Sequence, residues 1–180
     1  IPKSNLKDVM IEKKYEDNFL AAINEPVKEI MTRGVVSLSN KASIGETIEI
    51  MISNQLGAIP LVDADEKLVG IVTERDIALS LAGMAGKDTV QDYMSAKVFT
   101  TTPGTPLEGV CKIMVRNGLR RIPVVGAEAD ISKAAKKLLG ILTSTDVIRF
   151  LNAKELFDHL NSNLATDVLK TVISEIMVED

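Results

Sequence analysis

Two matching segments carry the side chains best suited to binding chemistry. The first runs from Gly70 to Asp76 as GIVTERD, and the second runs from Gly140 to Asp146 as GILTSTD. Each reads as a short apolar strand followed by a helix start, where a hydroxyl and a carboxylate lie beside the first free N–H groups of a helix. Such a place suits a small polar molecule, and its duplication predicts a binder with pseudo-two-fold symmetry.

The same four positions also fit a simpler role. Thr-x-x-Asp can be only a helix-capping box, in which the two side chains satisfy the first-turn backbone. For Thr73 and Asp76 alone the capping box is the simpler interpretation. The second copy, at Thr143 and Asp146, lies like the first beside an Ile-Pro strand, and this repetition favours a ligand site.

The elements that must position these segments form an internal repeat. The segment 27–31 (VKEIM) recurs as 90–94 (VQDYM), a shift of 63, and the shift later becomes 70 because residues 126–136 contain an insertion. We therefore divide the body of the chain into repeat 1 (27–85) and repeat 2 (90–152).

Each repeat has the pattern strand, helix, strand, strand, helix. In repeat 1 the expected elements are a strand at 35–38, a helix from a capping Ser43 to Gly57, strands at 58–62 and 68–72, and a helix from Glu74 to about Leu81. In repeat 2 they are a helix with a Thr105–Glu108 capping box and Pro106 in its first turn, strands at 121–125 and 138–142, and a helix from Ser144 to about Asn152.

This order predicts an α/β (α+β-like) fold of two tandem βαββα units packed sheet to sheet about a pseudo-two-fold. Pro60 within a strand predicts an edge position or a bulge. The helix that contains Ile48, Met51 and Ile52 should turn one apolar face to the core.

The two ends lie outside the repeats. Residues 1–26 predict a mobile start and a short helix near 19–23. Residues 153–180 predict a helical linker followed by ISEIM at 173–177, which resembles the start of a third repeat. We expect the chain to be a fragment of a longer one. A similar pattern at 6–10 arises as readily by chance.

Composition excludes several classes of function. The net charge of −4 and the 3% aromatic content argue against wide nucleic-acid contact, and no apolar run is long enough for a membrane span. One cysteine among 180 residues fits a reducing compartment, so we expect a cytoplasmic protein. The only histidine, His159, has no nucleophile or metal-ligand partner near it in the sequence, so we expect no enzyme, no metal and no catalytic cofactor.

Both repeats resemble cystathionine-β-synthase (CBS) domains, and the pair resembles a Bateman module. The resemblance is based on Met31 and Met94 before the first strands, the IPLV and IPVV strands, and the two Gly-h-h-Thr-x-x-Asp segments, where h is apolar. The resemblance covers nearly all of 27–152. It implies a regulatory module that binds AMP, ADP, ATP or S-adenosylmethionine, with AMP as first choice, and modulates an attached or partner protein.

The resemblance also implies which residues contact that ligand. Asp76 and Asp146 would hold ribose hydroxyls, with support from Thr73 and Thr143, because a carboxylate can accept both hydroxyls of a cis-diol. Each site would borrow residues from the other repeat. The Asp146 site would combine Thr145 with Ser37, Ala42, Gly57, Ala58, Ile59 and Pro60, and the Asp76 site would use Thr100, Thr105, Leu119, Arg120, Arg121, Ile122 and Pro123.

Arginines would hold the phosphates, because the guanidinium pairs with phosphate oxygens bidentately. Arg120 and Arg121 resemble the basic residues of the family, and Arg75 lies beside Asp76; each can also be an ordinary surface residue. Repeat 1 has Gly57 and Ala58 where repeat 2 has the arginine pair, so unequal affinities are expected.

A second hypothesis keeps the fold without the ligand. In it the chain is an assembly scaffold that forms a homodimer or pairs with further CBS units of the same chain. A catalytic α/β domain is a third and weaker possibility. The regulated partner is not identified by the sequence.

Overall fold

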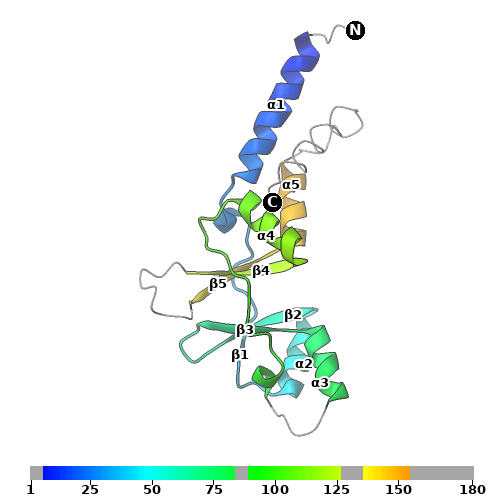
Figure 1. Cartoon of the computed structure of the whole chain (residues 1–180), viewed down its shortest axis with the longest axis vertical. Helices are drawn as coiled ribbons and strands as arrows, with labels where there is room; N and C mark the ends of the chain where they lie inside the picture. The colour runs from blue at the N-terminus through cyan, green and yellow to red at the C-terminus, as the bar shows by residue number, and fades with distance from the viewer. Residues whose placement is uncertain (1–5, 84–88, 127–135, 155–180) are drawn as a thin grey trace. The chain divides into compact units, whose positions relative to one another are not determined.

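The computed structural model describes residues 6–83, 89–126 and 136–154. The chain divides into two compact units, which are described separately (Figure 1). The helical unit comprises Ile1–Met31, Pro103–Arg121 and Leu142–Asp180, and the sheet unit comprises Thr32–Thr102 and Ile122–Ile141. The predicted third repeat start at 173–177 and His159 lie outside the described residues.

The sheet unit contains the whole of the repeat 1 sheet. Its strands are β1 (Leu38–Ser39), β2 (Ala58–Val62) and β3 (Leu68–Thr73), in the order β1-β2-β3. Along β3 the buried residues alternate with half-buried ones, as a strand with one face on a core requires. Figure 1 shows α2 (Ile44–Asn54) and α3 (Glu74–Ala82) beside this sheet. Ile59, Leu61 and Val72, all fully buried, form the centre of its core.

Pro60 lies in the middle strand and pairs regularly with Ile71 of β3, so neither the expected edge position nor a bulge at Pro60 itself is found. The parallel pairing of β1 with β2 begins only at Leu61, and therefore no partner on that side needs the N–H that Pro60 lacks. On the other side the register with β3 shifts between Leu61 and Val62.

The second sheet is shorter. It consists of β4 (Arg121–Val125) and β5 (Leu138–Thr143). Thr101 forms an isolated parallel bridge with Val124, in the place where β1 pairs with β2 in repeat 1. The starts of β3 and β5 meet where the Leu68 N–H donates to the Lys136 carbonyl at 2.9 Å. The βαββα order is thus present in both repeats, with a single-residue bridge as the first strand of repeat 2.

The helical unit holds α1 (Leu6–Ile23), α4 (Leu107–Asn117) and α5 (Ser144–Ala153). A short helix near 19–23 was expected, but α1 has 18 residues. Much of its length consists of Lys, Glu, Met, Leu and Ala, which lose little rotamer freedom in a helix. These residues favour a helix even though α1 has no continuous apolar stripe.

The start of α4 also differs from expectation. Pro106 is the N-cap residue in an extended conformation, and no side chain caps the helix, so the predicted Thr105–Glu108 capping box is wrong. Glu108 instead pairs with Lys112 one turn later at 2.8 Å. In α2 the Ser43 hydroxyl does accept from the Glu46 N–H, as predicted.

The ends of α2 and α4 occupy equivalent positions with different residues. Gly118 ends α4 with φ of +61°. Helix α2 ends earlier than the predicted Gly57, because Gln55 adopts the left-handed conformation with φ of +54°. A residue with a Cβ is strained there, whereas glycine is not.

The first segment of each repeat is fixed to the other repeat. The short 3-10 helix Val27–Glu29 is held where the Val27 N–H donates to the Thr105 carbonyl at 2.9 Å. Its counterpart Val90–Asp92 is held where the Val90 N–H donates to the Ala42 carbonyl, also at 2.9 Å. Both valines are fully buried. This exchange explains why the compact units do not coincide with the sequence repeats.

Candidate ligand-binding site

Thr73 and Asp76 form a reciprocal capping box at the start of α3. The Asp76 Oδ2 accepts from the Thr73 N–H and from the Thr73 hydroxyl, each at 2.8 Å, and the Asp76 N–H donates to Thr73 Oγ1 at 3.3 Å. Both side chains are half-buried. No hydrogen bond from a described residue reaches Oδ1 of Asp76. Since each carboxylate oxygen has two lone pairs, Oδ1 retains its capacity to accept from a ligand.

Thr143 and Asp146 repeat this geometry at the start of α5. The Asp146 Oδ2 accepts from the Thr143 N–H and hydroxyl at 2.8 Å each, and the Asp146 N–H donates to Thr143 Oγ1 at 3.1 Å. Asp146 takes part in a further interaction that Asp76 lacks. The simpler interpretation, a capping box, therefore describes both segments locally, and it occupies one carboxylate oxygen of each.

Most first-turn N–H groups of these helices already have acceptors. The Glu74 N–H donates to the Gly57 carbonyl at 3.1 Å, and the Ser144 N–H donates to the Arg120 carbonyl at 2.9 Å. In the described part of the chain, the second helical residue of α3, Arg75, keeps an N–H without an acceptor. The expected row of free N–H groups is thus reduced to about one donor per helix.

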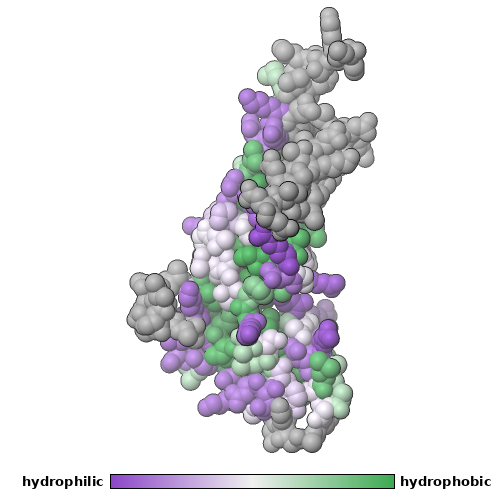
Figure 2. Space-filling view, in the orientation of Figure 1, coloured by the Kyte–Doolittle hydropathy of each residue, from purple (hydrophilic) through white to green (hydrophobic). Residues whose placement is uncertain are grey.

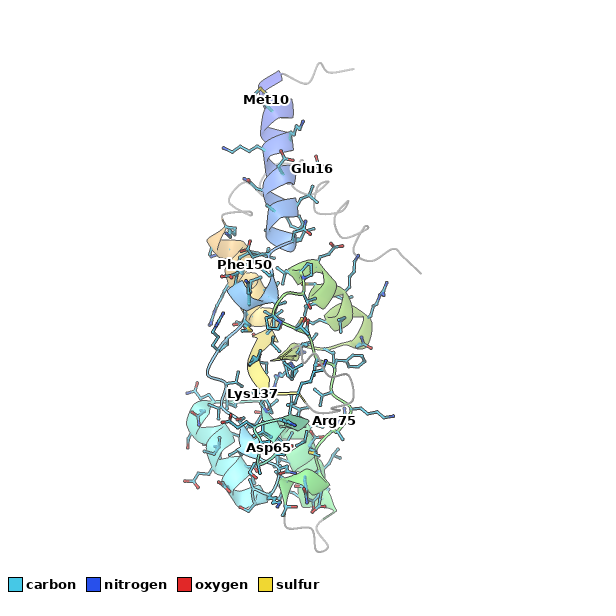
Figure 3. All side chains as sticks on the ribbon, turned by 90° about the vertical axis from the view of Figure 1, so that its left-hand side faces the viewer. Met10, Glu16, Asp65, Arg75, Lys137 and Phe150 are labelled. Atoms are coloured by element: carbon cyan, nitrogen blue, oxygen red, sulfur yellow. The ribbon has the colours of Figure 1, made fainter. Side chains whose placement is uncertain are left out.

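Within the sheet unit, the structure brings two predicted residues to the start of α3. They are Gly57, whose carbonyl accepts from the Glu74 N–H, and Ala58, which is buried and pairs with Thr73 between β2 and β3. Arg75 is exposed and projects from the same helix start (Figure 3). Ala42 is buried and holds Val90 through its carbonyl. Of the others in this unit, Ser37 is half-buried and Thr100 is exposed, and no hydrogen bond given for the described residues links either to Asp76.

Within the helical unit, Arg120 is brought to the start of α5 by its carbonyl, and its side chain is exposed. Arg121 follows it and is half-buried, as are Leu119 and Thr105, whereas Thr145 is exposed. The unit therefore joins the arginine pair to the capping box of its own repeat. The expected use of these arginines together with Asp76 stays a prediction.

The two Ile-Pro pairs lie in the interior, whereas most of the predicted polar site residues are half-buried or exposed. Ile59, Pro60 and Ile122 are fully buried, and Pro123 is buried as well. Their side chains belong to the core. Because the whole residues are buried, main chain included, the structure leaves a ligand almost no surface on them, and their expected contact with a ligand stays a prediction.

An apolar groove of about 430 Å³ lies along α2 and α3, and the sequence did not predict it. Ile52, expected to face the core, is 73% exposed, whereas Met51 beside it is buried. A signal was present in the sequence, because the apolar residues of α2 cover more of its circumference than one buried face needs. The groove is lined by Ile48, Met51, Ile52, Gln55, Leu56, Glu74 and Ile77.

The single cysteine shows no sign of activation. Burial raises the pKa of the Cys111 thiol, and the nearby Glu108 carboxylate raises it further, so the thiol stays protonated. Within the described ranges no group of three or more His, Cys, Asp or Glu side chains is placed to hold a metal ion.

Both repeats of the chain match the model of one protein family. The model of the CBS domain matches residues 27–83 and 90–153. The chain belongs to the CBS domain family. The two matched segments contain both capping boxes and the exchanged repeat starts.

Relatives of this CBS pair include archaeal and bacterial proteins. MJ1225 of Methanocaldococcus jannaschii is 38% identical over 172 residues, which cover 95% of this chain and 59% of MJ1225. The CBS domain-containing protein YhcV of Bacillus subtilis is 35% identical over 101 residues, which cover 55% of this chain and 71% of YhcV.

Solved CBS pairs have the same fold. The CBS domain pair of protein MJ0100, in complex with 5′-methylthioadenosine and S-adenosyl-L-methionine, is 31% identical with a TM-score of 0.61, and the match covers 72% of this chain and 98% of that one. CBSX2 in complex with AMP is 24% identical with a TM-score of 0.62, covering 72% and 98%, and shows the fold alone.

Several relatives are longer than this chain. It spans 59% of MJ1225, and about a quarter of a homoserine O-acetyltransferase and of an L-aspartate semialdehyde sulfurtransferase. Among the helices that the structure describes, none combines the length and the hydropathy needed to cross a bilayer.

Proposed function

We propose that this CBS pair is a regulatory module that binds an adenosine-containing ligand. The observation that supports the proposal is that the two carboxylate oxygens of Asp76 have different hydrogen-bond partners. Its Oδ2 is committed to the helix cap, whereas its Oδ1 is left without a partner among the described residues. A half-buried acceptor of this kind suits the vicinal hydroxyls of a ribose.

The MJ0100 pair supports this ligand class. At 31% identity, that protein binds 5′-methylthioadenosine and S-adenosyl-L-methionine, which share an adenosine moiety with both ribose hydroxyls. We choose AMP as the first candidate because arginines accompany the capping boxes, with ADP, ATP and S-adenosylmethionine as the others. Arg75, Arg120 and Arg121 would pair with phosphate oxygens, a role that S-adenosylmethionine would leave unused.

The two sites should differ in affinity. The start of α5 is joined to Arg120, whereas the start of α3 is joined to Gly57, which has no side chain. The start of α3 also carries two acids, Glu74 and Asp76, whereas α5 carries only Asp146 in its first turn. Negative charge at a helix start disfavours a phosphate, so the α5 site is the better candidate for a phosphorylated ligand.

The module would act on another protein or domain rather than catalyse a reaction. Its relatives include enzymes of which the match covers about a quarter, such as an inosine-5′-monophosphate dehydrogenase of Methanocaldococcus jannaschii. A single cysteine among 180 residues allows no disulfide within the chain and fits a reducing, cytoplasmic setting.

Calorimetric titration of AMP, ADP, ATP and S-adenosylmethionine tests the proposal, with Asp76→Asn as the informative variant. Asparagine keeps one oxygen for the Thr73 N–H and hydroxyl but replaces the unused Oδ1 by a donating NH₂. Removing a charged hydrogen bond of about 1.5–3 kcal/mol should weaken binding roughly 10- to 100-fold at the Asp76 site. The stability of the variant should stay within about 1 kcal/mol of the wild type, because the cap survives.

The matched control is Asp65→Asn. Asp65 is exposed on the turn between β2 and β3, which precedes β3, whereas α3 begins at the other end of that strand, so this variant removes the same charge away from the Thr73–Asp76 capping box. It should bind as the wild type does. Absence of binding by every ligand at millimolar concentration would overturn the proposal, and equal affinities for the two variants would overturn the role of Asp76 in it.

The alternative is a scaffold without a ligand, and the groove along α2 and α3 favours it. Ile52 and Leu79 on these helices are 73% and 59% exposed, which is costly for an isolated surface. A dimer that forms equally well with and without nucleotide, measured by light scattering, would support the scaffold.

A further inference from the structure

Among the described residues of the helical unit, the backbone hydrogen bonds that attach the α1 segment lie just after its C-terminal end. The Leu107 N–H donates to the Glu25 carbonyl at 2.9 Å, just after α1 ends. The Val27 N–H then donates to the Thr105 carbonyl, and the Lys28 N–H donates to that of Pro103, each at 2.9 Å. The segment after α1 therefore lies antiparallel to residues 103–107, with one isolated bridge between Pro26 and Pro106.

Residues near this attachment are buried, whereas Met10, farther along α1, is exposed. Near the attachment, Ala22 is 4% exposed, Val27 is fully buried and Leu107 is 1% exposed. Farther along the helix, Met10 is 67% exposed, and Met10 and Glu16 project from α1 in Figure 3. Hydrophilic residues interrupt the hydrophobic ones along the visible face of α1 (Figure 2). Within the part of the chain that the structure describes, the buried attachment of α1 is formed by its last turn and by residues 103–107.

The attachment point coincides with a predicted ligand residue. Thr105 is expected to contact the ligand, and its carbonyl is the acceptor for Val27. The equivalent residue of repeat 1, Ala42, is also a predicted ligand residue, and its carbonyl holds Val90. Each predicted ligand segment is therefore fastened to the segment that begins the other repeat.

We infer that α1 is the output element of the module, coupled to ligand occupancy through residues 103–107. This inference rests on the proposed function, and on the expectation from the family resemblance that Thr105 contacts the ligand. A ligand that orders Thr105 reduces the local opening of the loop, and the hydrogen bonds to Val27 and Lys28 cannot open unless the loop separates from them. Occupancy therefore tightens the attachment of α1. By reciprocity, loosening α1 weakens binding of the ligand by the same factor.

Hydrogen exchange on the intact chain tests the coupling, with AMP as the probe. AMP should slow exchange of the Val27, Lys28 and Leu107 amides about fivefold or more, the lower end of typical coupling factors. The amides of Asp65 and Lys67 serve as the internal control, because both donate to Asp63 Oδ1 within one turn. They should exchange at an unchanged rate.

A matched pair of variants tests the reciprocal effect. Ala22→Asp places a charge at the buried attachment, and Ala21→Asp places the same charge at the exposed neighbouring position. The Ala22 variant should speed exchange at Val27 and bind AMP about fivefold or more weakly than the Ala21 variant.

The outcomes separate the two proposals. If calorimetry shows that AMP binds while exchange at Val27, Lys28 and Leu107 is unchanged, the coupling is overturned and the proposed function stands. The same holds if Ala22→Asp releases α1 yet binds AMP as Ala21→Asp does. If no adenosine ligand binds the wild type, the proposed function fails and the coupling fails with it.

Discussion

Replacing Gly70 by alanine tests the exchanged packing of the two repeats most sharply. A Cβ added at Gly70 would overlap Met94 Sδ, and it would lie 2.9 Å from Met94 Cγ and 3.1 Å from the Ser95 carbonyl oxygen. Met94 and Ser95 belong to the start of repeat 2, whereas Gly70 lies on β3 of repeat 1. The Gly70 backbone is outside the left-handed region, so the effect of alanine is one of packing alone.

The expected loss of stability depends on whether Met94 and Ser95 can move away from the added methyl group. The Met94 side chain is flexible and can change rotamer, but the Ser95 backbone exchanges hydrogen bonds with Ile71 at 2.9 and 3.1 Å and cannot shift freely. Overpacking of this kind costs about 1–3 kcal/mol. At roughly 2–4 °C per kcal/mol for a chain of this size, a cost near 2 kcal/mol lowers the Tm by roughly 4–8 °C.

Urea and thermal unfolding measure this cost, with Gly104→Ala as the matched control. A Cβ at Gly104 meets nothing within 4 Å, so that variant should stay within about 0.5 kcal/mol of the wild type. In a double-mutant cycle, Met94→Ala should relieve part of the Gly70→Ala penalty, with a coupling of about 1 kcal/mol. Equal stability of the two glycine variants, or strict additivity with Met94→Ala, would refute the exchanged packing.

Further predictions concern the helix ends and the thiol. Gln55→Gly should stabilise the fold by about 0.5–1 kcal/mol by relieving the left-handed residue, and Gly118→Gln should destabilise it by about 1–2 kcal/mol, both measured by urea unfolding. Cys111 should react with iodoacetamide more slowly at pH 8 than a free thiol, because its pKa is raised. Glu108→Gln should lower that pKa and speed the reaction modestly; a slower reaction would contradict the stated cause.

The repeat could be predicted from sequence because its evidence is local. The Ile-Pro strands, the strand ending at Thr73 and the helix starting at Glu74 follow from alternation and capping, and the structure has them at those positions. The end of α2 was missed for a physical reason. A glycine is the usual signal for a left-handed helix end, but here Gln55 takes that conformation two residues before Gly57.

The site could be predicted only in part. The Thr73–Asp76 pair was recognised, but the use of one carboxylate oxygen by the cap depends on atomic geometry that spacing does not reveal. The exchange of Val27 and Val90 between repeats joins residues far apart in the chain, and no local pattern indicates such contacts. The outward position of Ile52 likewise depends on where the neighbouring helix α3 lies.

The most direct test of the central claim compares AMP with its 2′,3′-dideoxy analogue by calorimetry, on the wild type and on Asp76→Asn. If Asp76 Oδ1 holds the ribose, removing the hydroxyls should cost the wild type roughly tenfold or more in affinity at that site, whereas the asparagine variant should lose much less. An analogue that binds the wild type as tightly as AMP would contradict the account, because the carboxylate would then have no sugar to hold.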